Sequence, residues 1–577
     1  MSPRFFYYPP RLGDNRGLIN PELNVKGSLM RKDNIIIIGF SFTGKSVVGK
    51  RTAEKLGWQY IDSDHAIAAA VGKPIPDIFA EKGESHFRAL EREMLQDVCG
   101  RKNKVIVTGG GAIVDPRNRE LFLRSGVVIC LEAHPKTIYK RLLESKQMED
   151  TVPRPLLKAA DPMARVIQLK TSRQAYYAVA DRAVFTDNMT VDETVEAVIM
   201  EFEKVKSQRK DTARQTTPFI VTTPADNYPV FVGWGLLEGL GRRMRQCGLS
   251  GSALIISDDN VFPHHGEKAI ESLKAEGFKT ATYIVPAGES TKTIDTAIKI
   301  YDWMVKQHAE RGHAVVALGG GMVGDLAGFT AATFLRGLPL VHVPTSLMAM
   351  TDSSIGGKVA VNHPKAKNLI GAFYQPRLVL ADVSTLKTLP KRELVSGWAE
   401  VIKHAMILDA DFLDLLESNA DDLSKLKPAV IAEVVRRSAY IKSTVVGEDE
   451  KEQRKRMVLN YGHTIGHGLE AATGYGRLLH GEAVSVGMTG AAMLSQRLGM
   501  IKRDVVLRQK KILERFGLPV VCSDVKLAPV LKAMALDKKV KEKKIQWVLL
   551  EGIGKTTFRD DVPDRDIVKV IKELIVS

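Results

Sequence analysis

The sequence contains few cysteines, few aromatic residues and no long apolar run. Its 4 cysteines in 577 residues are isolated, with no Cys-x-x-Cys pair, which excludes a disulfide framework and a thiolate metal site. No apolar run approaches the ~20 residues that cross a bilayer, and the N-terminus has no signal-peptide apolar core, so we expect a cytoplasmic protein without a membrane partner. Aromatic residues make up only 6% and basic residues are spread along the chain, which argues against a nucleic-acid partner.

The charge that is present favours small anionic ligands. Lysine and arginine total 83 against 67 acidic residues, giving a formal net charge of +16. Phosphorylated or carboxylated small molecules fit such an excess when no single basic face is apparent. The length indicates about three domains, each large enough for its own core.

The hydrophobic pattern predicts an α/β multidomain protein. Residues 1–30 lack periodicity and are expected to form a poorly ordered leader. Ile/Val-rich strands alternate with amphipathic helices over residues 31–205, which is typical of a P-loop kinase-like parallel α/β sheet. A polar run at 206–217 is the expected linker. A Rossmann-like α/β subdomain is predicted over 218–388 and a mainly helical metal-binding subdomain over 389–577, with an active site in the cleft between them.

Specific strands are expected in the two later parts. They cover residues 253–256, 281–285, 314–318, 340–343 and 545–550.

A phosphate-binding loop follows the first strand. The strand at residues 35–38 runs directly into GFSFTGKS at 39–46, which is a complete G-x-x-x-x-G-K-[ST] pattern between a strand and a helix. Backbone N–H groups of such a loop bind phosphates, Lys45 reaches the outer phosphates and Ser46 can hold Mg²⁺. We therefore expect ATP or a related nucleotide as a co-substrate.

Acidic and basic motifs follow the loop. Asp62 and Asp64 are expected on the same face of a strand end, where one carboxylate could serve Mg²⁺ and the other an acceptor hydroxyl. Further along come Phe87-Arg88, a triple glycine at 109–111, RPLL at 154–157, and Arg173. These motifs, in this order over residues 34–200, resemble the shikimate kinase family. One departure is Phe42-Thr43, where the family commonly has small residues.

The kinase resemblance implies a role for each matching residue. Shikimate would be held by Asp64, Arg88, Gly110 and Arg173, and Mg²⁺ by Asp62 with Ser46. Arg154 would stabilise the transferring phosphoryl group from a mobile lid, and the nucleotide would lie against Thr43, Gly44 and Lys45.

Three segments of the second module predict a dinucleotide site. They are GESTK at 288–292, GGGMVGD at 319–325 and VPTS at 343–346, each after an expected strand. Glycines at a strand-to-helix turn let a pyrophosphate approach the backbone. Downstream, Lys358 and Lys367 lie in segments expected to be loops and suit an acidic, phosphorylated substrate.

Histidine spacing predicts a metal site. In NYGHTIGH at 460–467, His463 and His467 are four residues apart and share a helix face, and His480 returns on an expected loop. The remaining partner is best sought at Glu400, which shares a helix face with Lys403 in an apolar segment where an unpaired carboxylate is costly. The spacing alone would make both His463 and His467 ligands.

The second module resembles 3-dehydroquinate synthase over residues 219–565. The motifs that carry the resemblance are GGGxxGD, DSSIGGK, AEVIK, GHTxGH and LHGEAV, in family order. The resemblance implies that Zn²⁺ or Co²⁺ is bound by Glu400, His463 and His480, which moves His467 to the substrate. It assigns to the NAD site Glu289, Lys292, Gly321, Asp325, Thr345, Ser346, Lys358, Lys367, Thr385 and Thr388. It assigns to substrate binding or catalysis Asp352, Lys358, Lys403, Lys442, Arg456, Asn460 and His467, with Arg336 reaching across from a homodimer partner.

Together the resemblances imply a bifunctional shikimate-pathway enzyme. It would phosphorylate shikimate at its 3-position and convert 3-deoxy-arabino-heptulosonate 7-phosphate to 3-dehydroquinate by transient NAD-dependent oxidation, phosphate elimination and ring closure. An alternative is another small-metabolite kinase joined to a polyol dehydrogenase, but a neutral polyol would leave the lysine-rich face unmatched. A nucleic-acid-binding P-loop module with an inactive partner is a further alternative, and it needs a concentrated basic face.

Overall fold

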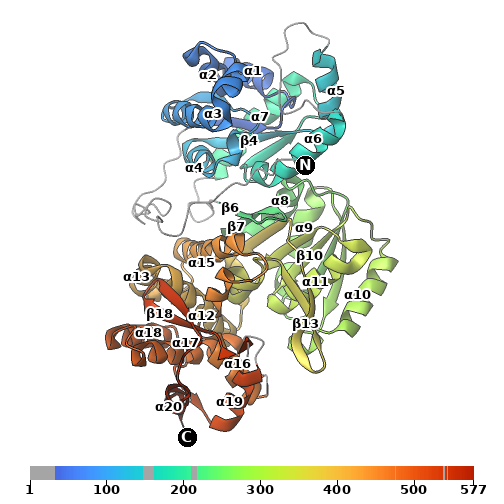
Figure 1. The fold of residues 1–577 in the computed structure, drawn as a ribbon. Helices are drawn as coiled ribbons and strands as arrows, with labels where there is room; N and C mark the ends of the chain where they lie inside the picture. The colour runs from blue at the N-terminus through green and yellow to red at the C-terminus, as the bar shows by residue number, and fades with distance from the viewer. Residues whose placement is uncertain are drawn as a thin grey trace.

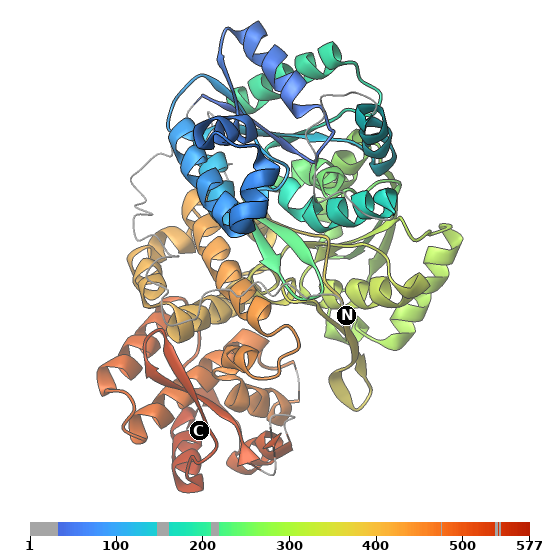
Figure 2. The same ribbon diagram turned by 45° about the horizontal axis from the view of Figure 1, so that its top comes forward.

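The computed structural model describes residues 33–146, 161–208, 218–474, 476–536, 540–541 and 544–576. They form an N-terminal α/β domain, a second α/β part and a mainly helical part (Figures 1 and 2). The expected leader at 1–30, Arg154 and residues 209–217 of the expected linker lie outside the described residues. No helix within the described ranges is long and apolar enough to cross a membrane.

The N-terminal domain is built on a parallel five-stranded sheet in the order β2-β3-β1-β4-β5. Its strands are β1 (Ile35–Gly39), β2 (Gln59–Asp62), β3 (Lys104–Val107), β4 (Val127–Glu132) and β5 (Arg182–Phe185). Its helices are α1 (Lys45–Leu56), α2 (Ser63–Val71), α3 (Ile75–Cys99), η2 (Ala112–Val114), α4 (Pro116–Ser125), α5 (Pro135–Lys146), α6 (Pro162–Tyr177) and α7 (Val191–Gln208). Residues 206–208, expected in the linker, therefore belong to α7.

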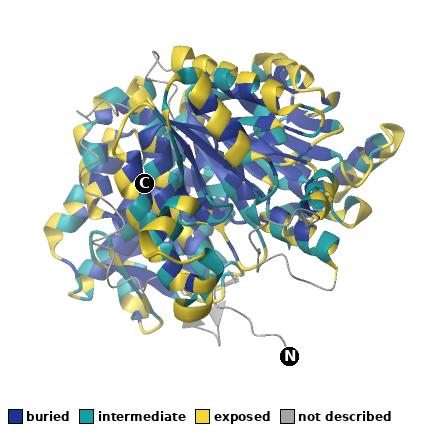
Figure 3. Cartoon of the chain, turned by 90° about the horizontal axis from the view of Figure 1, so that it is seen from above, coloured by how far each residue is buried: buried dark blue, intermediate teal, exposed yellow. Residues whose placement is uncertain are grey.

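The central position of β1 explains its composition. The four isoleucines of β1 are at most 1% exposed, because helices cover both faces of the sheet. Figure 3 shows the strands as the buried interior beneath partly exposed helices. Since parallel strands all end at one edge, the loop after β1 opens beside those after β2 and β3, where the site lies.

The second α/β part contains a seven-stranded sheet in the order β6-β7-β14-β11-β10-β8-β9, with only β6–β7 antiparallel. Its strands are β6 (Phe219–Thr222), β7 (Asn227–Gly233), β8 (Ser252–Asp258), β9 (Lys279–Val285), β10 (Ala314–Gly319), β11 (Leu340–Pro344) and β14 (Leu378–Asp382). Its helices are η5 (Leu236–Gly239), α8 (Leu240–Gln246), α9 (Phe262–Ala275), η6 (Glu289–Thr291), α10 (Ile294–Lys306), α11 (Gly321–Thr333), η7 (Phe334–Arg336), η8 (Ala349–Ser353) and η9 (Val383–Thr388). The four expected strands in this part are confirmed, each one to three residues longer.

A hairpin replaces the loops expected around Lys358 and Lys367. β12 (Lys358–His363) pairs with β13 (Ala366–Phe373) and projects from the sheet (Figure 1). The glycines before Lys358 predicted a loop, but the alternating apolar residues of β12 pack on α11 and form a strand.

The C-terminal part is mainly helical, as predicted. Its helices are α12 (Lys391–Leu408), α13 (Ala410–Ser418), α14 (Ala420–Ser424), α15 (Pro428–Glu448), η10 (Lys455–Asn460), α16 (His463–Ala472), α17 (His480–Arg497), α18 (Arg503–Arg515), α19 (Leu527–Leu536) and α20 (Asp564–Leu574). Its short strands are β15 (Cys522–Ser523), β16 (Val540–Lys541), β17 (Lys544–Ile545), β18 (Trp547–Gly552), β19 (Lys555–Arg559) and β20 (Ile575–Val576). The single strand expected at 545–550 is therefore divided between β17 and β18.

Candidate active sites

The phosphate loop joins β1 to α1 in the N-terminal domain. Lys45 Nζ donates to the Phe40 carbonyl at 2.8 Å, and Thr43 Oγ1 donates to the same carbonyl at 2.9 Å. Ser46 Oγ donates to Asp62 Oδ2 at 2.9 Å. A hydroxyl beside a carboxylate at the N-terminus of a helix supplies the oxygen ligands that Mg²⁺ prefers next to bound phosphate.

A cavity of about 390 Å³ opens beside this loop. Among the residues that line it are the expected acceptor residues Asp64, Arg88, Gly110 and Arg173, together with Lys45, Ser46 and Asp62. A Cβ on Gly109 would lie 2.5 Å from Asp64 Oδ1, and one on Gly111 would lie 2.5 Å from Arg88 Nη2. The triple glycine therefore lets both charged side chains approach the backbone.

The sequence predicted Asp64 at a strand end, but the structure places it in a helix. Asp62 is the last residue of β2 and caps α2, accepting hydrogen bonds from the backbone N–H groups of Asp64 and His65 at 3.1 and 3.3 Å. Asp64 consequently lies in the first turn of α2. Both carboxylates still face the cavity because the chain turns into the helix there.

Glu91 is a cavity residue that the sequence reading missed. Its carboxylate is buried on α3 and accepts a hydrogen bond from Arg88 Nη1 at 2.8 Å, while Oε1 accepts none from the residues described. Burial raises the pKa of Glu91 although Arg88 opposes the shift. Its position three residues after Arg88, on the apolar side of a helix, is the signal that could have found it.

The dinucleotide-type motifs converge where β9, β10 and β11 end. Lys292 Nζ lies 2.9 Å from Glu289 Oε1 and 3.0 Å from Asp325 Oδ2, and these carboxylates raise the pKa of Lys292 against the effect of burial. The backbone N–H of Thr345 donates to the Gly319 carbonyl at 3.0 Å. Gly321 begins α11, and Ser346 Oγ would lie 3.5 Å from a Cβ on Gly320.

The hydroxyl groups of the two threonines expected in the cofactor site donate to backbone carbonyls of their own segment. Thr385 Oγ1 donates to the Asp382 carbonyl at 2.8 Å, and Thr388 Oγ1 donates to the Thr385 carbonyl at 2.9 Å. Both lie on η9, just after β14, at the same edge of the sheet. Lys367 is exposed on the β13 hairpin.

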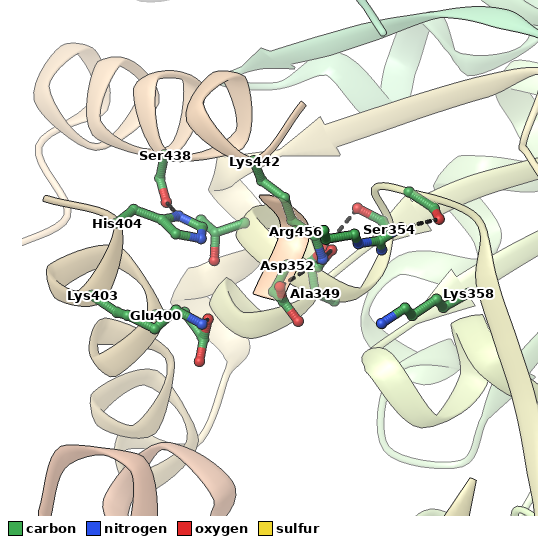
Figure 4. Close-up of polar contacts among 12 residues, drawn as sticks. Ala349, Asp352, Ser354, Lys358, Glu400, Lys403, His404, Ser438, Lys442 and Arg456 are labelled. Atoms are coloured by element: carbon green, nitrogen blue, oxygen red, sulfur yellow. Dashed lines mark hydrogen bonds and ion pairs between the residues drawn. The ribbon is translucent and has the colours of Figure 1, made fainter. Parts of the chain in front are cut away.

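Cationic side chains from the two later parts meet across the predicted cleft (Figure 4). Lys442 of α15 points to Asp352 of η8, with Nζ 2.6 Å from Oδ1, while Lys358 points toward the same space from β12. Burial lowers the pKa of Lys442 to about 8. Arg456 Nη1 donates to the carbonyls of Gly356 and Glu450 at 3.2 and 2.8 Å.

Glu452 is a second residue that the sequence reading missed. Its carboxylate pairs with Lys358 and accepts a hydrogen bond from Asn460 Nδ2 at 3.2 Å. It therefore contacts two residues assigned to substrate or cofactor. In the sequence it lies in a short, mostly basic run at 451–456 that matches none of the motifs described above.

The expected metal ligands come together from three helices. Glu400 lies on α12, His463 begins α16 and His480 begins α17 rather than lying on a loop. Glu400 is 1% exposed and forms an ion pair with Lys403, yet neither of its oxygens accepts a hydrogen bond from the residues described. Its Oε1 lies 3.8 Å from His463 Nε2 and 4.0 Å from His480 Nε2.

These separations fit ligands of a shared ion. They are too long for hydrogen bonds and about half an ångström longer than the ~3.4 Å between ligands of a tetrahedral zinc ion, so a small side-chain movement brings all three onto one ion. His463 Nδ1 lies 3.2 Å from the Tyr461 carbonyl, and His480 Nδ1 lies 3.3 Å from Glu470 Oε2. Acceptors at both Nδ1 atoms favour the tautomer in which Nε2 is the ligand atom.

Geometry alone allows two further groups of potential ligands. Potential ligand atoms also lie within 4.8 Å of one another in the trios His467–Glu470–His480 and Asp352–Glu400–His404. His404 is buried, has Nδ1 2.8 Å from Ser438 Oγ, and has its pKa lowered well below the usual value by burial. Glu400–His463–His480 is the trio in which a buried carboxylate faces two imidazoles that are oriented by acceptors at Nδ1.

Arg336 stands apart from this cluster. It is exposed at the end of η7, and both it and Leu335 have positive φ values of 67° and 49°. Within the described ranges, no hydrogen bond or ion pair joins it to the other residues assigned to substrate.

Comparisons with known proteins identify the families of both parts of the chain. The shikimate kinase family matches residues 42–203, the 3-dehydroquinate synthase N-terminal family matches 282–396 and its C-terminal family matches 397–540. The 3-dehydroquinate synthase of Crocosphaera subtropica is 45% identical over 61% of this chain and 98% of its own length. That of Nostoc punctiforme is 46% identical over 61% of this chain and 97% of its own length.

Two solved structures share the fold of the synthase part. The 2-epi-5-epi-valiolone synthase of Streptomyces hygroscopicus, with NAD⁺ and Zn²⁺ bound, is 29% identical at a TM-score of 0.56, covering 60% of this chain and 96% of its own. A 2-deoxy-scyllo-inosose synthase complexed with carbaglucose-6-phosphate, NAD⁺ and Co²⁺ is 28% identical at a TM-score of 0.56, covering 62% of this chain and all of its own. The chain thus belongs to the 3-dehydroquinate synthase family and carries a shikimate kinase domain fused before the synthase.

Proposed function

We propose that the two enzyme domains catalyse the reactions of their families. The kinase transfers the γ-phosphoryl group of ATP to the 3-hydroxyl of shikimate. The synthase converts 3-deoxy-arabino-heptulosonate 7-phosphate to 3-dehydroquinate and releases phosphate. The observation that carries the second assignment is the metal-type trio Glu400–His463–His480 beside a cluster of buried cations.

In the kinase, the residues that line the cavity bind different parts of the two substrates. Arg88 and Arg173 bind the shikimate carboxylate, and Asp64 accepts hydrogen bonds from the acceptor hydroxyl. Ser46 and Asp62 hold Mg²⁺, and Lys45 neutralises charge on the outer phosphates. Catalysis then rests on position and electrostatics, because phosphoryl transfer needs little covalent help.

In the synthase, the residues fit NAD and a divalent metal. When bound, NAD accepts and returns a hydride and the metal polarises the substrate oxygens. Glu289, Lys292 and Asp325 orient the nucleotide at the sheet edge. The phosphate and carboxylate of a phosphorylated sugar acid are both negatively charged and need cationic partners. The chain offers four cations: Lys358, Lys403, Lys442 and Arg456.

His467 is proposed to contact substrate and move protons. Its ring centroid lies 5.4 Å from that of His463 and 6.1 Å from that of His480, so it borders the proposed metal ligands. Lys358 and Asn460 both bind the Glu452 carboxylate in the absence of substrate. We propose that the incoming substrate displaces Glu452 from these two residues. An anionic group of the substrate takes the same partners.

We propose further that the enzyme forms a homodimer through the synthase and works in the cytoplasm, where ATP and NAD are supplied. Support for the dimer comes from large exposed apolar side chains on α10 and η7, with Ile298 50%, Val305 63% and Leu335 40% exposed. Arg336 follows Leu335 and would reach the other subunit. Sedimentation velocity tests this: Leu335→Asp is expected to give monomers, and an unchanged sedimentation coefficient would refute it. Cell fractionation tests the location.

Two assays test the proposed reactions. Phosphate release from 3-deoxy-arabino-heptulosonate 7-phosphate is measured with and without NAD⁺ and a zinc chelator, and ADP formation is measured with and without shikimate. Release that ignores both NAD⁺ and the chelator would refute the synthase assignment. Net NADH accumulation with a polyol would favour a dehydrogenase instead.

A further inference from the structure

The kinase and the synthase meet at the helix that carries Arg173. This helix, α6, packs on β7 of the synthase, and its Gln174 reaches the C-terminal end of α8, which lies below α6 in Figure 1. Ile220 of β6 also packs against the apolar core of the kinase. The contact therefore reaches beyond a covalent linker between the two domains.

Gln174, next to Arg173, ties the two domains together. Its Oε1 accepts a hydrogen bond from Lys170 Nζ at 2.7 Å, and its Nε2 donates to Glu132 Oε1 at 2.9 Å. The same Nε2 donates to the backbone carbonyl of Gln246, the last residue of α8, at 2.8 Å. Lys170 completes the network by bonding Glu132 Oε2 at 2.7 Å, with both side chains buried.

A second tie forms just past the end of α6. The Ala180 carbonyl accepts hydrogen bonds from Arg243 Nη1 at 2.6 Å and from Gln246 Nε2 at 3.2 Å. Arg243 also donates to Gln246 Oε1 at 2.8 Å and lies 4.2 Å above the Phe231 ring. Within the described ranges no carboxylate pairs with Arg243, so a charged guanidinium is committed to this carbonyl near the negative end of the α6 dipole.

The adjoining face of α6 holds the kinase site. Tyr177 Oη donates to the Gly110 carbonyl at 2.6 Å, and Arg173 Nη1 lies 3.4 Å from the same oxygen. Gly110 and Arg173 both line the acceptor cavity. Because α6 is rigid, the ties at Gln174 and Ala180 fix the place of Arg173 relative to Gly110.

We propose that α8 of the synthase is a positioning element for the kinase, with Arg243 and Gln246 seating α6 so that Arg173 meets the acceptor carboxylate. The inference rests on the proposed kinase function. It makes the affinity of one enzyme for its acceptor depend on a helix of the other. Neither Arg243 nor Gln246 touches substrate.

The test uses the full-length chain carrying Arg243→Met and Gln246→Ala together. The KM for shikimate is expected to rise about threefold to tenfold, the size of one net hydrogen bond, while kcat, the KM for ATP and synthase activity stay within about twofold. Arg243→Lys, which keeps a donor, should restore much of the loss. Lys268→Met, which removes an exposed cation from the neighbouring α9, is the matched control.

Amide hydrogen exchange gives a readout that does not depend on the acceptor. The double variant should speed exchange in α6 and leave the helices α1 and α7 unchanged. An unchanged KM with unchanged α6 exchange would overturn the inference, and so would a uniform fall in all kinase constants with faster exchange throughout the domain. Failure of the unmodified chain to phosphorylate shikimate would refute the kinase assignment, while α6 exchange would still report on the seating of the helix.

Discussion

Replacing Glu470 by glutamine should weaken metal binding without removing a ligand. The Glu470 side chain is buried on α16, and its carboxylate lies 3.3 Å from His480 Nδ1. It fixes the imidazole so that Nε2 faces Glu400, 4.0 Å away. Glutamine keeps the size of the side chain and one acceptor oxygen but removes the charge that makes the imidazole a better ligand.

The magnitude follows from this indirect role. Loss of a partner that orients a metal-bound histidine costs about tenfold to a hundredfold in affinity, or about 1.4–2.7 kcal/mol. We expect Glu470→Gln near the lower end, because an acceptor remains, and Glu470→Ala near the upper end. Loss of Glu400 or His463, as direct ligands, should cost more than either. His467→Ala should keep the metal within about threefold and lose the rate of phosphate release.

The assay is competition for Zn²⁺ with a chromophoric chelator, with metal content measured after dialysis. The competing geometry is the trio His467–Glu470–His480. If His467→Ala and Glu470→Gln lose metal equally while Glu400→Gln retains it, the proposed ligand set is wrong. That result would return His467 to the metal, as its spacing from His463 first suggested.

Other predictions separate the two activities. Lys45→Ala or Asp64→Ala should abolish shikimate-dependent ADP formation and leave phosphate release from the heptulosonate unchanged, as paired assays on one preparation would show. A zinc-selective chelator in excess Mg²⁺ should do the reverse, and loss of both activities would contradict separate sites. Burial lowers the pKa of Lys442 to about 8, so this cation is lost as pH rises through that value. The kcat/KM for the anionic heptulosonate should therefore fall above about pH 8, and Lys442→Arg should move this fall to higher pH.

The sequence by itself determined what depends on neighbouring residues. The isoleucine run and the G-x-x-x-x-G-K-S pattern at 39–46 predict a buried strand, a phosphate loop and a helix, because strand propensity and glycine geometry act locally. The four-residue spacing of His463 and His467 likewise places them on one helix face, and α16 confirms this. The order of the strands and helices in both α/β parts followed from the same periodicity.

Only the tertiary structure decided which distant side chains meet. Spacing could not show that Glu400 faces His463 and His480, because their three helices are brought together by packing of the apolar core. The ion pair between Glu452 and Lys358 has no signal in the sequence, because the two residues are brought together only by the fold. The tie between Gln174 and Gln246 has no local signal, since hydrogen bonds between separate domains depend on how their surfaces fit.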